Sequence, residues 1–130
     1  AETGVDALAV AVGSSHAMTD RSASLDIALI GRLRSALDVP LVLHGSSGVA
    51  DAVIMDAVRA GMTKINVSTH LNGFFTRAVR SVLGADERLV DSRKYIAPGR
   101  AAVVDEAARM LRLFALQGAE PSSATSEESA

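Results

Sequence analysis

The sequence contains no cysteine and no tryptophan, and only one tyrosine and three phenylalanines among its 130 residues. Without cysteine there can be no disulfide framework, so a reducing compartment is permitted and we expect a cytoplasmic protein. No apolar run approaches the ~20 residues that are needed to cross a bilayer, which argues against a membrane partner. The net charge is only −2, which argues against binding to nucleic acid.

Aliphatic residues make up for the missing aromatic ones. Residues of the hydrophobic types account for 48% of the chain, mostly as Ala, Val, Leu and Ile. This composition suits buried parallel strands wrapped by helices and suits a disordered chain poorly. We expect residues 1–117 to form one domain, and residues 118–130, which are mostly Ser, Glu and Ala, to form a disordered low-complexity tail.

Apolar runs alternate with stretches of helical periodicity along the chain. The predicted strands are Ala7–Val12 and Leu41–Leu43, both read as buried, and Lys64–Val67. The predicted helices run from a cap at Ser24 to about Leu37, from a cap at Asp51 to Ala60, from about His70 to Leu83, and from about Gly99 to Leu116. The alternation predicts right-handed βαβ units and therefore a parallel sheet.

Two α/β architectures agree with this pattern, an open doubly wound sheet and a (β/α)₈ barrel. A barrel takes ~250 residues and eight strands. The barrel interpretation therefore requires further strands upstream of Ala1, and the chain would be a fragment of the whole domain.

Polar residues gather immediately after each predicted strand. His16 follows the first strand, His44 ends the second, and Asn66, Ser68 and Thr69 finish the third. In a parallel α/β fold these positions meet at the carboxyl edge of the sheet, where ligands bind. The sequence therefore predicts a ligand site at this edge.

Two of the three histidines are candidates for metal ligands. Histidine is a common Zn²⁺ ligand, and a catalytic zinc usually takes three protein ligands and keeps one position open. His16 and His44 follow adjacent strands, so their rings could converge on one ion, although each alone would more often form a hydrogen bond within a loop. His70 is expected to face solvent from the first turn of a helix and makes a poor third ligand.

Two small-residue loops precede helices. They are Gly45-Ser46-Ser47-Gly48 and Ser68-Thr69. Small residues let backbone N–H groups approach an oxyanion, and a helix N-terminus adds a favourable dipole. A single loop of this kind is more often a plain turn, but two on neighbouring strands indicate a phosphate site.

The motifs at these positions resemble those of a known family, the class II fructose- and tagatose-bisphosphate aldolases. The family patterns are L-V-L-H-G-G-S-G, K-I-N-V-x-T, G-T-S-H and D-P-R-K-Y…P-x-R. Their counterparts here are Leu41–Gly48, Lys64–Thr69, Gly13–His16, and Asp91–Tyr95 followed by Pro98 and Arg100. The resemblance covers roughly Thr3 to Leu116.

The resemblance implies a fold and a set of roles. The fold would be the C-terminal three βα units of a TIM (β/α)₈ barrel plus a terminal helix. The implied metal ligands are His16 and His44, the implied phosphate-binding residues are Gly45, Ser47, Ser68, Thr69 and Arg93, and the implied substrate contact near the reacting carbons is Asn66. Whether Arg93 acts within one subunit or across a dimer is left open. The implied cofactors are Zn²⁺ and, as a further expectation, a monovalent cation.

The implied activity is reversible cleavage of a ketose bisphosphate to dihydroxyacetone phosphate and an aldehyde, with Zn²⁺ stabilising the enediolate. A homodimer or homotetramer is expected when the protein is complete. The alternatives are a non-catalytic sugar-phosphate-binding remnant and a metal-free phosphate-binding barrel such as an isomerase, and the histidine pair argues against the second.

The sequence also departs from the family pattern. Ala17 replaces a usual Gly, Ser46 replaces the second Gly of the loop, and His70 replaces a usual acidic residue. The Asp-His segment, in which the family carries its first zinc histidine and its proton-transfer aspartate, is absent. A general base must lie within hydrogen-bond reach of the proton it takes. We therefore expect this chain to need residues from elsewhere for catalysis.

Overall fold

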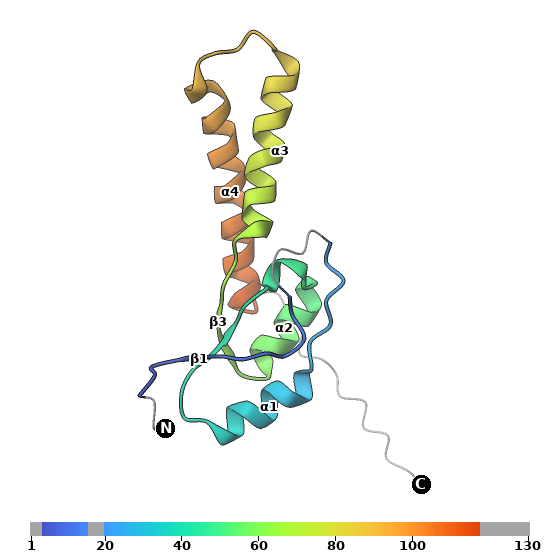
Figure 1. Ribbon diagram of the computed structural model, residues 1–130, viewed down its shortest axis with the longest axis vertical. Helices are drawn as coiled ribbons and strands as arrows, with labels where there is room; N and C mark the ends of the chain where they lie inside the picture. The colour runs from blue at the N-terminus through green and yellow to red at the C-terminus, as the bar shows by residue number, and fades with distance from the viewer. Residues whose placement is uncertain (1–3, 16–19, 118–130) are drawn as a thin grey trace.

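The computed structural model of the chain describes residues 4–15 and 20–117 (Figure 1). Its elements, in chain order, are β1 (Leu8–Ala9), α1 (Ile27–Ala36), β2 (Leu41–Leu43), the 3₁₀ helix η1 (Ser46–Gly48), α2 (Asp51–Arg59), β3 (Met62–Ile65), α3 (Thr69–Ala85) and α4 (Ser92–Phe114). The predicted tail at residues 118–130 lies outside the described residues, as does His16.

The three strands form one sheet in the order β1-β2-β3, and both neighbouring pairs are parallel. Leu8 pairs with Leu41, and Leu43 pairs with Ile65. Each pair of strands is joined by a helix, α1 or α2. The expectation of an α/β fold with parallel βαβ units is confirmed.

The first strand differs from its prediction. It is shorter than Ala7–Val12, and both residues of β1 are exposed, with Leu8 at 36% of its accessible surface. The physical reason is its position, because β1 is an edge strand of the sheet and pairs with β2 alone. Burial begins further on, at Val12, which is 2% exposed.

The core lies between the sheet and helices α1 and α2. Leu41 and Leu43 point to the same side of β2, as the two-residue period of a strand requires, and both are fully buried. They pack with Ile30 of α1 and Ala57 of α2. This packing holds the carboxyl end of β2 in place, and the polar residues of the candidate site follow that end directly.

Two helices begin differently from the prediction. The cap of α1 is Asp26 rather than Ser24, because the Asp26 carboxylate accepts a hydrogen bond from the Leu29 amide at 2.8 Å. Asp51 does not cap α2. It is the first helical residue, after Ala50, and its carboxylate is engaged by two arginines described below.

The boundaries around β3 are also corrected. The strand ends at Ile65, so Asn66 lies beyond it rather than within it. Helix α3 begins at Thr69 and ends at Ala85, which places Gly84 inside the helix and not after it.

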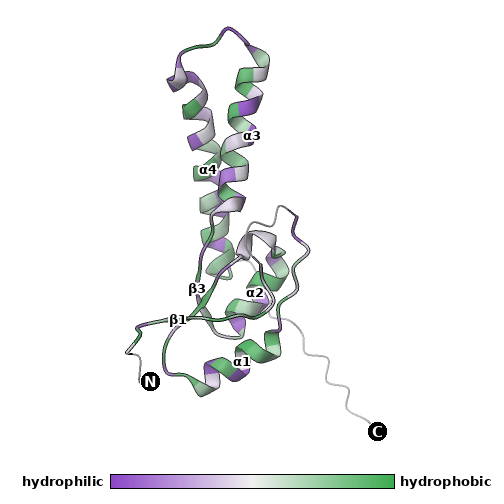
Figure 2. Ribbon diagram, in the orientation of Figure 1, coloured by the Kyte–Doolittle hydropathy of each residue, from purple (hydrophilic) through white to green (hydrophobic). Residues whose placement is uncertain are grey.

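Helix α4 begins at Ser92, earlier than the predicted start at Gly99. Asp91 caps it by accepting a hydrogen bond from the Arg93 amide at 3.1 Å, and Pro98 is accommodated inside the helix. Helices α3 and α4 form a long antiparallel pair that projects away from the sheet (Figure 1), with polar and apolar residues interspersed along it (Figure 2). Gly99 permits the close approach, since a Cβ there would lie 2.7 Å from Cε2 of Phe75.

No helix within the described part of the chain is both long enough and apolar enough to cross a bilayer.

Candidate functional site

A small pocket opens at the carboxyl ends of β2 and β3. Its volume is about 160 Å³, and it lies between the loop after β2 and the N-terminus of α3. The residues that line it are His44, Gly45, Ser46, Ser47, Asn66, Val67, Ser68 and Thr69. The structure thus brings together six residues that the sequence singled out separately: His44, Gly45, Ser47, Asn66, Ser68 and Thr69. We call this pocket the cradle.

The loop after β2 depends on glycine and on a buried serine. Gly45 has φ +67°, a left-handed conformation that favours glycine. Ser46 is 2% exposed, and its hydroxyl donates to the Asn66 carbonyl at 2.6 Å, tying this loop to the end of β3. The departure from a second glycine at Ser46 is therefore accommodated, because its side chain makes an interaction that glycine could not.

Hydrogen bonds also orient His44. Lys64 Nζ donates to Asn66 Oδ1 at 2.6 Å, so the amide nitrogen of Asn66 faces the His44 ring, 3.2 Å from Nε2. Nε2 is then the acceptor and carries a lone pair. A ring nitrogen with a lone pair is the form that a metal ligand requires.

Ser47 connects the two loops of the cradle. Its Oγ accepts a hydrogen bond from the His70 backbone amide at 3.1 Å, so it satisfies one of the first N–H groups of α3 from another loop. Ser68, at the N-cap position of α3, makes no side-chain capping bond. The dipole of α3 and hydroxyl groups from three residues, Ser47, Ser68 and Thr69, thus meet at the cradle, an arrangement suited to an oxyanion.

Arg93 does not join the cradle. It lies at the start of α4, at the end of the α3–α4 pair that is remote from the sheet (Figure 1), and its side chain is 90% exposed. Its guanidinium pairs with the Asp91 carboxylate at 2.9 Å, and this hydrogen bond lowers the pKa of Asp91. Within this chain, therefore, the predicted phosphate role of Arg93 has no geometric support.

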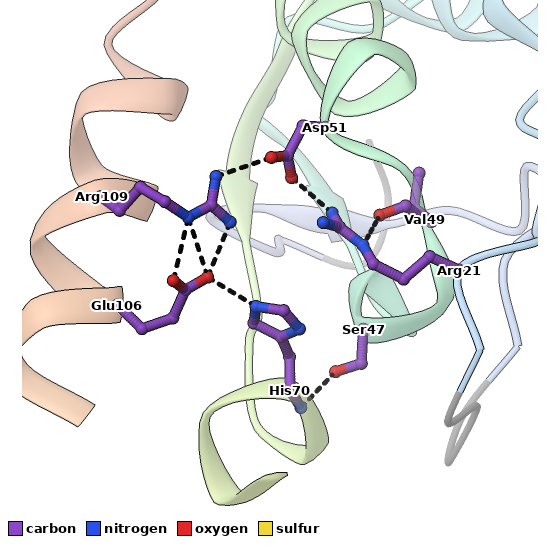
Figure 3. Close-up of polar contacts among 7 residues, drawn as sticks. All are labelled: Arg21, Ser47, Val49, Asp51, His70, Glu106 and Arg109. Atoms are coloured by element: carbon purple, nitrogen blue, oxygen red, sulfur yellow. Dashed lines mark hydrogen bonds and ion pairs between the residues drawn. The ribbon is translucent and has the colours of Figure 1, made fainter. Parts of the chain in front are cut away.

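A chain of charged groups lies beside Ser47 of the cradle (Figure 3). His70 Nε2 lies 2.6 Å from Glu106 Oε1, Arg109 donates to both oxygens of Glu106, and Arg109 Nη1 donates to Asp51 Oδ2 at 2.6 Å. Arg21 Nη2 lies 2.6 Å from Asp51 Oδ1, and Arg21 Nε donates to the Val49 carbonyl at 2.7 Å. This network, from His70 to Arg21, ties together α2, α3, α4 and the segment before α1.

The expected exposure of His70 is wrong. Its side chain is 14% exposed and Glu106 is 6% exposed, because α4 packs along α3 and covers the first turn. The hydrogen bonds from Arg109 lower the pKa of Glu106 despite its burial, and His70 adds to the lowering.

The pKa values of Asp51 and Arg109 in this network are also shifted by their hydrogen bonds. Burial raises the pKa of Asp51, but hydrogen bonds from Arg109 and Arg21 outweigh it and the pKa is lowered. Hydrogen bonds to Glu106 and Asp51 raise the pKa of Arg109 above its ordinary value. Asp51, Glu106 and Arg109 are therefore charged at neutral pH.

Sequence reasoning missed Arg21, Glu106 and Arg109. The i, i+3 spacing of Glu106 and Arg109 could have indicated a pair on α4. No local signal could have shown that this pair also reaches His70 and Asp51, because those contacts depend on how α4 folds back along the chain.

A metal centre of three ligands is not formed by residues 4–15 and 20–117 alone, where no three His, Asp or Glu side chains converge. Of the two predicted ligands, His44 lies at the cradle with a suitable ring nitrogen, and His16 falls outside the described residues.

The sequence profile of the family described as "Fructose-bisphosphate aldolase class-II" matches residues 1–119. The chain belongs to this family. The aldolase family thus accounts for the order of motifs along the chain and for their convergence at the carboxyl edge of the sheet.

Solved structures of aldolases resemble the chain. The YdjI aldolase from Escherichia coli K12 is 34% identical with a TM-score of 0.68, and the match covers 89% of this chain and 41% of that one. A candidate fructose-1,6-biphosphate aldolase from Coccidioides immitis is 25% identical with a TM-score of 0.70, covering 90% of this chain and 40% of that one. A fructose-bisphosphate aldolase from Campylobacter jejuni is 18% identical with a TM-score of 0.69, covering 82% and 39%, and this likeness concerns the fold alone. The chain therefore spans about two fifths of the length of these proteins.

Proposed function

We propose that this aldolase-family chain supplies part of the active site of a class II ketose-bisphosphate aldolase. The reaction is the reversible cleavage of a ketose bisphosphate to dihydroxyacetone phosphate and an aldehyde. The observation that carries the proposal is the cradle, in which His44, Asn66 and four hydroxyl-bearing residues line one pocket at the carboxyl edge of a parallel sheet.

The proposal includes the architecture of the whole domain. We infer that β1, β2 and β3 are the last three strands of a (β/α)₈ barrel, as proposed for residues 1–117. The exposed apolar surface of Leu8 on the outer strand supports this, since a closed barrel pairs and covers both edges. The share of each solved aldolase that the chain matches supports it too.

Each residue of the cradle then has a defined task. The backbone N–H groups around Gly45 and the hydroxyl groups of Ser47, Ser68 and Thr69 bind the phosphate of dihydroxyacetone phosphate. Because the His70 amide already donates to Ser47 Oγ, the Ser47 hydroxyl proton is left to donate to a phosphate oxygen. The Asn66 amide, held by Lys64, orients the substrate near the reacting carbons.

His44 and His16 would hold Zn²⁺ together with a third ligand from outside this chain. Bound there, the ion would polarise the ketose carbonyl and offset the negative charge that develops as the carbon–carbon bond breaks. In the present arrangement the Nε2 lone pair of His44 accepts a hydrogen bond from the Asn66 amide, so zinc bound at Nε2 would take the place of that hydrogen bond.

A second candidate function is sugar-phosphate binding without cleavage. No carboxylate is among the described residues that line the cradle, so this chain offers no group there to move a proton. The two candidates share the cradle and differ in whether a general base is brought from elsewhere.

The test titrates the 130-residue chain with Zn²⁺ and with dihydroxyacetone phosphate by calorimetry. His44→Ala should lower zinc affinity about 10-fold or more. Ser68→Ala should weaken dihydroxyacetone phosphate binding while leaving zinc binding intact, and Ser81→Ala, on the exposed surface of α3, is the matched control. Unchanged zinc affinity in His44→Ala would refute the metal role. Unchanged ligand affinity in Ser68→Ala would refute the cradle.

Cleavage of fructose 1,6-bisphosphate is then measured with the chain alone. We expect none, because the proton-transfer group is absent. Cleavage by the isolated chain would show that a base within these residues has been overlooked.

A further inference from the structure

A larger cavity adjoins the cradle and is not used by the proposed reaction. Its volume is about 550 Å³, and it shares Ser47 and Thr69 with the cradle. The rest of its wall is formed by one face of α3 and by Arg21. The two spaces therefore share part of their wall at the N-terminus of α3.

The charges on this cavity are of one sign. Arg21, Arg77 and Arg80 line it, and none of the lining residues in the described part of the chain is Asp or Glu. Arg21 is balanced by Asp51, but Arg77 and Arg80 make no ion pair within residues 4–15 and 20–117. The wall formed by α3 thus carries positive charge that no carboxylate among the described residues neutralises by an ion pair.

The two ring nitrogens of His70 have different surroundings. Nε2 is held by Glu106 at 2.6 Å, and Glu106 is itself fixed by Arg109. Nδ1 makes no hydrogen bond to another described residue, and Figure 3 shows it on the side of the ring that faces Ser47, away from Glu106. The ring also stands edge-on to Phe74, with 5.1 Å between centroids. The His70 ring is thus fixed by Glu106 at one nitrogen and by packing against Phe74. Its other nitrogen is positioned to bind a ligand in the cavity.

The arginine nearest to this ring is held in a similar way. The Arg77 guanidinium lies 4.4 Å from the centroid of the Phe74 ring, so one aromatic ring contacts both the Arg77 and the His70 side chains. Arginine presents several N–H donors in one plane, which suits the oxygens of a phosphate.

We propose that this cavity is an anion site for a phosphate-class ligand, with the Arg77 guanidinium donating to the phosphoryl oxygens and His70 Nδ1, whose partner nitrogen Nε2 donates to Glu106, accepting from a hydroxyl group of the ligand. The ligand is either the free ion or the phosphoryl group of a sugar phosphate. The proposal deepens the proposed function and rests on it for the class of ligand, because phosphate is what the adjoining cradle is proposed to bind. Glu106 is the positioning residue, since it directs Nδ1 toward the cavity.

The test compares two replacements of His70, each of which keeps a polar group at the position of only one of the two ring nitrogens. An asparagine amide reaches the position of Nδ1, whereas a glutamine amide reaches the position of Nε2 and can keep the Glu106 contact. Inorganic phosphate is titrated into the full chain by calorimetry. We expect His70→Gln to lose about 10-fold in affinity and His70→Asn to lose clearly less.

A purely structural role of His70 predicts the opposite order of phosphate affinities for the two variants. If His70 served only to tie α3 to Glu106, glutamine would be the better replacement, and affinity would follow stability measured by urea unfolding. Glutamine equal to or better than asparagine overturns the proposal, and so does the absence of phosphate binding by the unmodified chain.

A matched pair of arginine variants checks the second contact. Arg77→Gln should weaken phosphate binding, whereas Arg88→Gln, the same change of charge at the remote end of the α3–α4 pair, should not. Equal losses in both variants would mean that the effect is only long-range charge and would also overturn the proposal.

The same variants are also titrated with dihydroxyacetone phosphate, which distinguishes the two possible forms of the ligand. If the His70 variants weaken both ligands, the cavity takes the phosphoryl group of a sugar phosphate. If they weaken only inorganic phosphate, it takes the free ion. A loss confined to dihydroxyacetone phosphate would place His70 in the cradle and refute a separate site. Ser68 lines only the cradle, so an unchanged dihydroxyacetone phosphate affinity in Ser68→Ala refutes the proposed function and leaves this site standing.

Discussion

Replacing Gly45 with alanine should destabilise the protein by an amount that its geometry sets. Gly45 has φ +67°, and a Cβ added there would lie 2.5 Å from the Ser15 carbonyl oxygen and 2.8 Å from the Ser15 carbonyl carbon. Both atoms belong to the backbone, so no side chain can swing aside to make room. The substitution therefore forces the loop after β2 and the segment that holds Ser15 apart.

Two terms make up the expected loss. A left-handed conformation costs an alanine about 1–2 kcal/mol. Overpacking of a tight contact adds about 1–3 kcal/mol. The lower entropy of the unfolded chain with alanine returns about 0.4–1 kcal/mol. The net loss is about 1–4 kcal/mol, a large part of the roughly 5–15 kcal/mol that stabilises a typical domain.

The assay is urea unfolding followed by circular dichroism at 222 nm. With slopes of about 1–3 kcal/mol per molar urea, the midpoint should fall by an amount on the order of 1 M. Gly31→Ala is the matched control. Gly31 lies inside α1 with no atom within 4 Å of an added Cβ, so the same chemical change should stabilise the protein by about 0.5–1 kcal/mol. A midpoint for Gly45→Ala equal to or above that of the unmodified chain would refute the close approach on which the shape of the cradle depends.

Three further predictions concern the packing of α4 and the charged network. Glu106→Ala should cost about 1–3 kcal/mol, because it leaves Arg109 and a histidine without their buried carboxylate, and Glu106→Gln should cost less. The folded-state pKa values of Asp51 and Glu106 are lowered, so their contribution to stability is present above their unfolded values near 4 and is lost as the pH falls through the folded values. Urea midpoints between pH 7 and pH 3 should therefore fall less steeply in Asp51→Asn/Glu106→Gln than in the unmodified chain. Gly99→Ala should lower the midpoint because a Cβ meets the Phe75 ring at 2.7 Å, and Phe75→Leu should recover part of that loss in the double variant.

Each of these three predictions has an outcome that contradicts it. An alanine at Glu106 that leaves the midpoint unchanged would mean that the buried carboxylate contributes nothing net. Parallel pH curves for the double variant and the unmodified chain would assign acid sensitivity to other carboxylates. Strict additivity of the changes at Gly99 and Phe75 would mean that the two side chains do not meet.

Local patterns allowed the α/β class and the residues of the cradle to be predicted. Leu41, Val42 and Leu43 form an apolar run too short for a helix, and the loop that follows contains only Gly and Ser before the next helix. A strand that runs directly into such a loop places the loop at the sheet's carboxyl edge in any parallel fold. For that reason His44, Gly45 and Ser47 could be predicted to lie together before the fold was known.

Element boundaries were less predictable because they depend on single contacts. The predicted start of the last helix at Gly99 comes directly after Pro98, a residue type that is unfavourable inside a helix. The Asp91 cap and the packing of α4 along α3 outweigh the lost hydrogen bond, and the helix starts at Ser92. Ser24 and Asp26 are both good caps, and only the observed bond to the Leu29 amide decides between them.

The sequence by itself determined that two small-residue loops and two histidines follow parallel strands, since residue type and spacing are local properties. Only the tertiary structure decided what surrounds them. His70 looked exposed from the pattern of its own helix, yet α4 returns along α3 and puts Glu106 against its ring, more than thirty residues away. Arg93 looked like a site residue from its motif, yet the length of the α3–α4 pair carries it away from the cradle. Contacts between distant segments depend on how whole helices pack, and no local pattern encodes that geometry.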